Sequence, residues 1–299
     1  MLLAIFNNFP PRTEPVPASE LVLENKPADA KASSSRAGAL IINADDWGRN
    51  IDTTDRILDC VLSGAVSSAS GMVFMADSER AAALAHEHGV DVGLHLNFTT
   101  PFSGQVALGR LAKHHTRVAH YLLQNRLSQI VYHPGLANSF EYLVTAQIEE
   151  FGRIYGTKPR RVDGHHHMHL CANVLLSGLL PAGTIARRNF SFQPGEKSSV
   201  NRFYRRVIDG VLARRHRLSD YFFSLLPMQP PERLDRIIAI ASQSVVELET
   251  HPVNQEEYRF LMRKELLQRP GTVRIDSWNA VPASDIGDKN IKGQSNGNA

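Results

Sequence analysis

The sequence predicts a parallel α/β fold in a single domain. Short apolar segments typical of buried strands alternate with segments whose apolar residues recur at helical spacing. Several of the apolar segments end in Asp, Asn or His, and functional residues collect at the carboxyl ends of strands in such folds. The 299 residues contain no internal repeat and no long linker within the body, so one domain with the size of a ~250-residue barrel is expected.

The two ends of the chain differ from its body. Residues 1–37 are rich in Pro, Ala, Ser and charged residues without a helical or strand period, and residues 284–299 are almost devoid of apolar residues. We therefore expect a disordered leader over 1–37, a folded domain over 38–283 and a disordered tail over 284–299. The chain has no transmembrane segment, because no apolar run approaches ~18 residues, and its N-terminal apolar run is too short for a signal peptide.

The composition is that of a globular protein with an unusual number of histidines. Apolar residues make up 42% and charged residues 21%, which excludes a wholly disordered or fibrous chain. Two cysteines give no disulfide framework, so a reducing compartment and a cytoplasmic location are expected. Four of the 13 histidines lie within His165–His169, and this concentration raises the question of chemistry.

The first half of the body predicts strands and helices in alternation. The core strand Leu40–Ile42 ends in polar residues 43–46. It is followed by a helix capped by Asp52 and stopped by Gly64. A strand over 65–73, an Ala-rich helix over 78–89 and an alternating strand over 90–97 come next, and the last places His95 and Asn97 on one face. Residues 101–135 have no clear period and predict an irregular insertion.

The second half continues the pattern. A helix is expected over 139–155, before Gly156 and Pro159. The following strand, over 161–169, places four polar side chains on one face by its period of two: Asp163, His165, His167 and His169. Arg187 and Arg188 follow a further strand end at residues 185–186, and a late strand over 245–252 contains Glu247 and reaches His251.

Carboxylate and imidazole groups at converging strand ends suit a metal site. One carboxylate and two imidazoles can bind Zn²⁺, Fe²⁺, Co²⁺, Mn²⁺ or, less typically, Mg²⁺, with positions left open for water and a substrate oxygen. Asp45 and Asp46 can divide two tasks, one as ligand and one as the acceptor of the proton of water. Taken alone, an Asp–Asp pair is commonly a turn or cap and His95 a core histidine, so the His165–His169 cluster is the more specific signal.

Four motifs of the chain resemble those of the YdjC-like carbohydrate deacetylases, also called the ChbG/HpnK family. They occur in the family's order between Leu40 and Pro252 and comprise residues 43–48 (NADDWG), 93–96 (GLHL), 163–169 (DGHHHMH) and 247–252 (ELETHP). The resemblance implies an irregular (β/α) barrel, one divalent metal ion and hydrolysis of N-acetyl groups on sugars that contain N-acetylglucosamine. We expect Mg²⁺ or Zn²⁺, with Mn²⁺ and Co²⁺ as alternatives.

The resemblance also implies roles for single residues. Asp45 matches the catalytic base, and Asp46, His95 and His165 match the metal ligands. His251 matches the histidine that protonates the leaving amine. Residues expected to support the ligands or to contact substrate are His167, which the predicted strand places on the face of His165, and Asn97, Arg187, Arg188 and Glu247.

The chain departs from the family pattern at three positions near these motifs. Trp47 stands where Phe is usual, which keeps a large aromatic side chain. Glu249 replaces a typically apolar Met, and Val253 follows Pro252 where a small residue is usual. The last two changes lie close to the expected acid and predict an altered fit of the substrate.

The segment Arg187–Arg217 is strongly basic, with nine basic and two acidic residues, whereas the whole chain has a net charge of +3. It is either a solvated helix face or a surface for an anionic partner such as a phosphorylated or lipid-linked sugar or a membrane surface. Nucleic acid is not expected, because no nucleic-acid-binding motif accompanies the charge. The position after a strand end predicts that Arg187 or Arg188 enters the pocket.

Together these features predict a metal-dependent carbohydrate N-deacetylase. Two alternatives remain from the residues alone: hydrolysis of another bond, a phosphoester or a simple amide, on the same barrel, and a glycan- or metal-binding module without turnover. A second carboxylate beside the metal carboxylate argues against the module, which has no use for it. The sequence leaves open the sugar, the metal and the oligomeric state, for which a homodimer is one arrangement.

Overall fold

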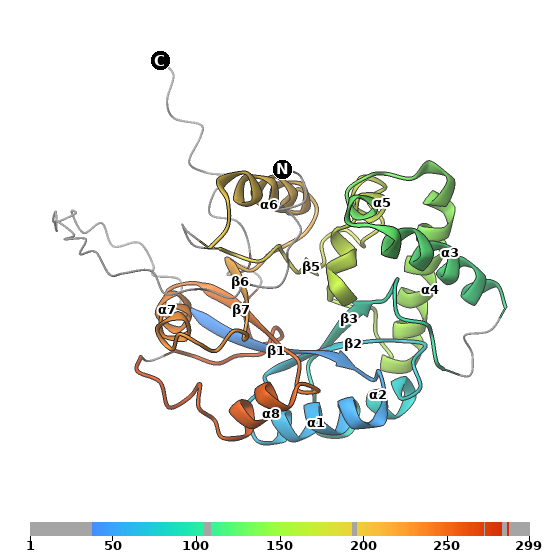
Figure 1. Cartoon of the computed structure of the whole chain (residues 1–299). Coiled ribbons are helices and arrows are strands. Elements are labelled where there is room, and N and C mark those ends of the chain that lie inside the picture. Colours follow the sequence, from blue (N-terminus) through green and yellow to red (C-terminus); the bar gives the residue numbers. More distant parts are fainter. Residues whose placement is uncertain (1–37, 105–108, 193–195, 272, 283–285, 287–299) are drawn as a thin grey trace, which may run out of the picture.

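The computed structural model describes residues 38–104, 109–192, 196–271, 273–282 and 286. These residues form a seven-stranded parallel sheet in the order β5-β4-β3-β2-β1-β7-β6. The sheet curls into an irregular barrel with helices around it (Figure 1). The predicted α/β barrel is therefore confirmed. Most of the predicted leader and tail lies outside the described residues.

The strands are short. They are β1 (Ala39–Trp47), β2 (Ser68–Gly71), β3 (Val92–Leu96), β4 (Arg161–Gly164), β5 (Ile185–Ala186), β6 (Tyr221–Ser224) and β7 (Val245–Thr250). The longer helices are α1 (Ile51–Leu62), α2 (Ser78–His88), α3 (Arg110–Gln124), α4 (Ala137–Tyr155), α6 (Ser199–Ala213), α7 (Glu232–Ala241) and α8 (Gln255–Met262), and α5 (Ala172–Leu176) is short.

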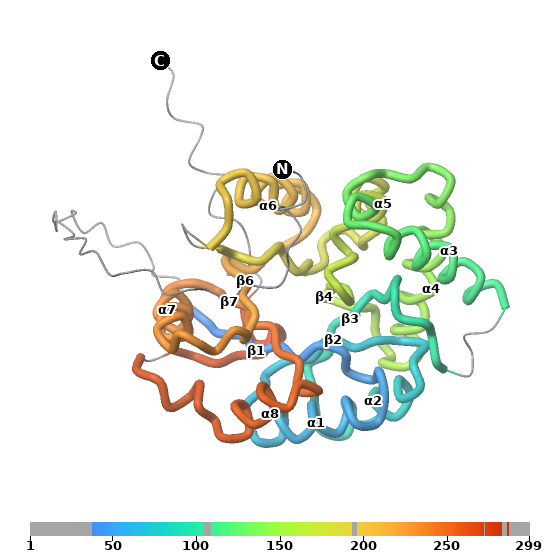
Figure 2. The backbone as a smooth tube through the Cα atoms, viewed as in Figure 1, coloured from blue at the N-terminus to red at the C-terminus, as the bar shows by residue number. Residues whose placement is uncertain are grey.

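Strand β1 is the centre of the fold. All nine of its residues are buried, which explains why its apolar residues run continuously instead of alternating. It pairs with β2 on one side and with β7, which is distant in sequence, on the other. Figure 2 shows this juxtaposition of the first and last strands in blue and orange. The polar ends of β1 and β7 therefore lie side by side.

The two edges of the sheet approach each other on the far side of the barrel. Ile185 of β5 forms a parallel bridge with Arg217, just before β6. Beyond this bridge, the Ser191 N–H donates to the Phe222 carbonyl in β6. These hydrogen bonds bring the residues after β5 close to the ends of β1 and β7.

Three local predictions were wrong in detail. The N-cap of α1 is Asn50, whose side chain accepts from the Thr53 N–H, whereas Asp52 lies in the first turn, where its charge favours the helix N-terminus. The insertion predicted to be irregular contains helix α3. Its buried residues, Leu111, His115, Val118 and Leu122, form a narrow helical stripe that the many polar residues between them concealed.

The third correction concerns the histidine cluster. Strand β4 ends at Gly164, and His165–Leu170 forms a 3₁₀ segment in which His166 and His167 have left-handed φ values of 54° and 57°. The turn is tight, because a Cβ at Gly164 would lie 2.9 Å from the backbone N of His169. The four side chains predicted on one strand face are thus distributed over a helical turn.

In the described residues, no helix is long and apolar enough to cross a membrane.

Candidate metal centre and active site

A bulge at the end of β1 brings two neighbouring carboxylates to one site. The register of β1 against β2 shifts between Ala44 and Trp47, and Asp46 has a left-handed φ of 72°. Adjacent side chains of a regular strand point to opposite faces, and the bulge removes this constraint. As a result Asp45 Oδ2 and Asp46 Oδ1 lie 3.9 and 3.4 Å from the same nitrogen, His95 Nε2.

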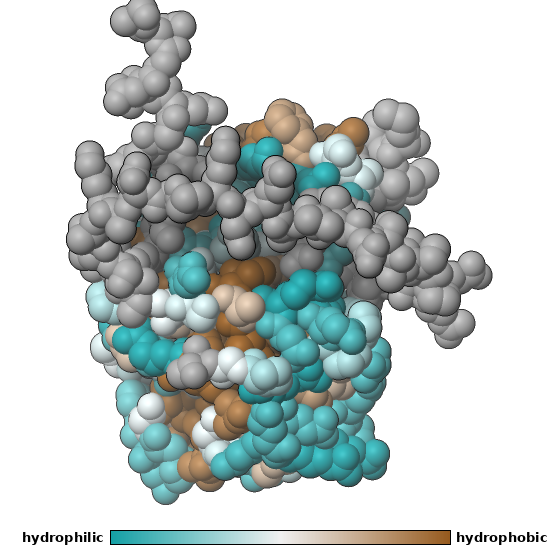
Figure 3. Space-filling model, turned by 90° about the vertical axis from the view of Figure 1, so that its left-hand side faces the viewer, coloured by the Kyte–Doolittle hydropathy of each residue, from teal (hydrophilic) through white to brown (hydrophobic). Residues whose placement is uncertain are grey.

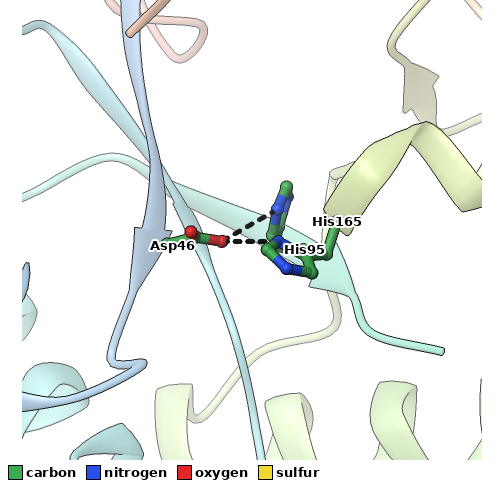
Figure 4. A group of neighbouring side chains, drawn as sticks. All are labelled: Asp46, His95 and His165. Atoms are coloured by element: carbon green, nitrogen blue, oxygen red, sulfur yellow. Dashed lines mark ion pairs between the residues drawn. The ribbon is translucent and has the colours of Figure 1, made fainter. Parts of the chain in front are cut away.

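Asp46 of β1, His95 of β3 and His165, which follows β4, converge on one point (Figure 4). Asp46 Oδ1 lies 2.8 Å from His165 Nδ1 and 3.4 Å from His95 Nε2. One donor atom of each residue lies within 4.8 Å of the other two, and all three residues are buried. These are the three residues that the family resemblance assigned to the metal.

Asp163 fixes the orientation of His95. The two residues are paired in register on β3 and β4, and His95 Nδ1 lies 2.7 Å from Asp163 Oδ1. The other carboxylate oxygen of Asp163 accepts from Ser70 Oγ at 2.6 Å. This arrangement leaves His95 Nε2 directed at Asp46, as is usual for a metal-binding histidine with a supporting carboxylate. Asp163 was not among the predicted site residues; the signal for it in the sequence is its position two residues before His165, on the same predicted strand face.

The electrostatics of the group suit a cation. Burial alone would lower the pKa of His95, but the carboxylates of Asp45 and Asp163 raise it to about 10. The surroundings therefore favour positive charge at His95 Nε2, which a divalent cation can supply in place of a proton. His165 Nε2 is also buried and has no hydrogen-bond partner among the described residues. One carboxylate oxygen and two imidazoles are the donor set of Zn²⁺ and related ions, so these residues fit a divalent metal.

Arg187 holds the carboxylate of Asp45. It follows β5, is 1% exposed, and forms two hydrogen bonds with Asp45, Nη1 to Oδ2 at 2.6 Å and Nη2 to Oδ1 at 2.8 Å. Burial would raise the pKa of Asp45, but Arg187 and His95 lower it to about 2. Asp45 is therefore ionised at neutral pH and able to accept a proton. Both of its oxygens are engaged by Arg187, which makes it less available than Asp46 as a metal ligand.

His251 lies close to Asp45 in a second group of side chains. Donor atoms of Asp45, Glu249 and His251 lie within 4.8 Å of one another at the ends of β1 and β7. The His251 N–H donates to Glu257 Oε2 at 2.8 Å, which anchors the residue to α8. Burial lowers the pKa of His251, so its ring is neutral near neutral pH.

Glu249, where the chain departs from the family pattern, is buried within this group. Its Oε1 lies 3.3 Å from Arg187 Nη1 and 3.5 Å from His167 Nε2. Burial and the charge of Asp45 raise the pKa of Glu249 well above its ordinary value. The raised pKa favours the neutral form of the Glu249 carboxyl, which lessens its repulsion of Asp45.

The remaining residues of the histidine cluster have separate contacts. His166 Nδ1 lies 3.0 Å from Thr99 Oγ1, and its ring lies 4.0 Å from that of His165. His167 does not share the face of His165, because the strand has ended, and it contacts Glu249 instead. His169 Nε2 lies 2.9 Å from the Arg187 carbonyl. The cluster thus links the metal group to the backbone that carries Arg187.

Three other predicted residues lie around the site without facing the metal group. Asn97 accepts from the backbone N–H groups of Thr99 and Thr100 and orders the turn after β3. Glu247 Oε1 accepts from Arg187 Nε at 2.8 Å. Of the two arginines after β5, Arg187 enters the site, whereas Arg188 pairs with Asp209 of α6.

Comparison of the sequence with known proteins assigns the chain to a family. The model of the YdjC-like protein family matches residues 39–271. The chain belongs to the YdjC-like family. This YdjC-like chain is 29% identical over 138 residues to a chitooligosaccharide deacetylase of Yersinia pestis, a match that covers 45% of the chain and 52% of the relative. A chitooligosaccharide deacetylase of Serratia marcescens is 30% identical, with 44% and 50% covered. The chain thus spans about half the length of these relatives.

A solved structure shares the fold of this YdjC-like protein. It comes from Enterococcus faecalis V583, is described as a candidate cellobiose-phosphate cleavage protein and has a TM-score of 0.55. The likeness covers 80% of this chain and 97% of that one at 18% sequence identity. It supports the irregular barrel as the architecture of the YdjC-like chain.

Proposed function

We propose that this YdjC-like protein is a metal-dependent hydrolase that removes N-acetyl groups from a sugar containing N-acetylglucosamine. The observation that carries the proposal is the pair Asp45 and Asp46 on one bulge: Asp46 faces two histidines, and Asp45 is ionised and held by Arg187. The named activity of the Yersinia and Serratia relatives, which match about half of their length, supports the substrate class.

Asp46, His95 and His165 would hold the metal ion. A divalent cation bound there activates water for attack and stabilises negative charge on the acetyl oxygen. We expect Zn²⁺ or Mg²⁺, with Mn²⁺ and Co²⁺ as alternatives. Asp163 keeps the His95 ring in the orientation that binding requires, through its contact with Nδ1.

The chain's own groups carry the proton from water to the amine. Asp45 accepts the proton of the water that attacks the acetyl carbon, while Arg187 fixes the direction of its carboxylate. His251, within 4.8 Å of Asp45, is neutral at rest and takes up this proton. It then donates the proton to the nitrogen as the C–N bond breaks, so that the free amine and acetate leave.

The test is release of acetate from a panel of N-acetylated sugars. The expected result is release by the unaltered protein and a loss of roughly 10²–10⁴-fold in Asp45→Asn, which is the usual contribution of general base catalysis. Metal content, measured in parallel, should remain in Asp45→Asn because Asp45 is not a ligand. An Asp45→Asn protein with the unaltered rate would remove Asp45 from its role as base.

A further inference from the structure

Helix α6 has the reverse of the usual distribution of side chains on a surface helix. Its buried residues are mostly polar: Asn201, Arg205, Asp209 and Leu212. Its exposed residues include Val200, Phe203 and Val207, with 54%, 64% and 47% of their surface accessible. At spacings of three and four residues these three side chains form one stripe. An apolar stripe that faces outward on an ordered helix indicates a surface that another molecule covers.

The polar contacts beneath α6 hold this stripe outward. Arg188 donates to Asp209 Oδ2 from Nε and Nη2, at 3.1 and 2.9 Å. The Asn189 N–H donates to Asp209 Oδ1 at 2.8 Å. Arg205 Nε donates to Asn201 Oδ1 at 2.8 Å. Rotating the helix to bury Phe203 would break the contacts of Asp209 with Arg188 and Asn189, at a cost in unpaired charge. The polar contacts of Asp209 therefore fix the outward position of the stripe.

The charges around the stripe are mostly positive, although the exposed Glu196 precedes the helix. Arg206 lies beside it on the same helix, and Arg214, Arg215 and Arg217 follow at its end, all exposed. The one acidic residue in the sequence between Lys197 and Ser219 is Asp209, which is buried and paired with Arg188. Exposed apolar residues flanked by arginines are the pattern of a helix that lies on an anionic lipid surface. A second copy of this chain fits less well, because two cationic faces repel each other.

The inner side of the same helix borders a pocket next to the candidate active site. Tyr204 and Arg205 of α6 line this pocket together with His166, His167 and Phe190. His167 in turn contacts Glu249 beside Asp45. Figure 1 shows α6 on the side of the barrel away from α1, α2 and α8, and in Figure 3 apolar surface is visible at the corresponding top of the molecule. The outward stripe and this pocket are thus joined through the same helix, whose residues Tyr204 and Arg205 line the pocket.

We propose that the outward face of α6, formed by Val200, Phe203, Val207 and the adjacent Arg206 and Arg214, docks on an anionic lipid surface. The docking itself does not depend on the deacetylase function. Its consequence rests on that proposed function: a sugar carried by a lipid would be presented to the pocket beneath α6.

The test is sedimentation of the full chain with vesicles of phosphatidylcholine alone or with about one-third phosphatidylglycerol. We expect the protein to sediment with the anionic vesicles only and to be released at high salt. Phe203→Ser and Arg206→Glu should each reduce the bound fraction about fivefold or more, because each removes part of the apolar or electrostatic attraction. The matched controls are Leu62→Ser on α1, 60% exposed, and Arg263→Glu, whose side chain is 73% exposed, and neither should change binding.

Absence of binding to anionic vesicles would overturn the proposal, as would equal binding by the α6 variants and their controls. Circular dichroism confirms that the variants compared are folded. A dimer in solution that Phe203→Ser dissociates would assign the face to a second copy instead and would also contradict docking. None of these outcomes involves acetate release, so a failure of docking is distinguishable from a failure of the deacetylase function.

Discussion

Arg187 forms a two-point contact with Asp45 across the barrel, at 2.6 and 2.8 Å, although 142 residues separate the two in sequence. The same guanidinium contacts Asp163, Glu247 and Glu249. It also lies over the ring of Phe222, with Arg187 Cζ 5.0 Å from the ring centre. One buried cation therefore sets the position of the candidate base and of the carboxylate that orients His95. The predictions below follow from this arrangement.

Arg187→Lys should impair both stability and activity. Lysine keeps the charge but cannot make the two parallel contacts with Asp45, and it leaves buried carboxylates without a donor. Loss of one partner of a buried pair costs about 3–5 kcal/mol, and retention of charge places the expected loss in unfolding free energy toward the lower end. Denaturant unfolding measures it, with Arg263→Lys, at a side chain that is 73% exposed, as the control. An Arg187→Lys protein as stable as the unaltered one would contradict the central position of Arg187.

Asp163→Asn should weaken metal binding without removing a ligand. The carboxylate at 2.7 Å from His95 Nδ1 selects the ring orientation in which Nε2 faces Asp46. Loss of such a supporting contact typically lowers metal affinity about 10–100-fold. Competition with a chromogenic chelator gives the affinity of both proteins. Unchanged affinity would show that Asp163 serves stability alone.

Glu249→Gln should be tolerated. Burial and Asp45 raise the pKa of Glu249, which favours the neutral carboxyl, and an amide is the near-isostere of that form. We expect a change in unfolding free energy of less than about 1 kcal/mol. Asp163→Asn is the contrast, because burial would raise the pKa of Asp163 but Arg187 and His95 hold it well below its usual range, so that this carboxylate is ionised. A large loss from Glu249→Gln would mean that Glu249 is ionised in the folded protein.

Protonation of His115 should make the protein less stable in mild acid. Burial lowers its pKa from 6.5 to about 4, and its ring packs 4.3 Å from that of Phe102. The unfolded chain binds the proton more readily, so stability is complete above about pH 6.5 and falls as the pH decreases toward 4, by up to about 1.4 kcal/mol per pH unit. His115→Leu should flatten this part of the unfolding profile, and His120→Leu, an exposed position on the same helix, should not.

Most of the site follows from the order of strands and their polar ends. Asp45, Asp46 and His95 lie at the predicted strand ends that the parallel sheet brings together, and Arg187 follows its predicted strand end. The bulge that turns both Asp45 and Asp46 toward His95 was not predicted. The failures have local causes. The period of two continues in residues 161–169 although the chain turns at Gly164, and the sequence does not reveal the left-handed residues His166 and His167. The role of Asp163 depends on the register of two strands, which a single sequence does not specify.

The measurement that bears most directly on the account is acetate release from N-acetylglucosamine oligomers by protein stripped of metal and then reloaded. Zn²⁺, Mg²⁺, Mn²⁺ and Co²⁺ would be added separately to the unaltered protein and to Asp46→Ala. The account predicts no release without metal, release restored by at least one ion, and none from Asp46→Ala. Release by Asp46→Ala, or equal release with and without metal, would contradict the assignment of Asp46, His95 and His165 as the metal centre.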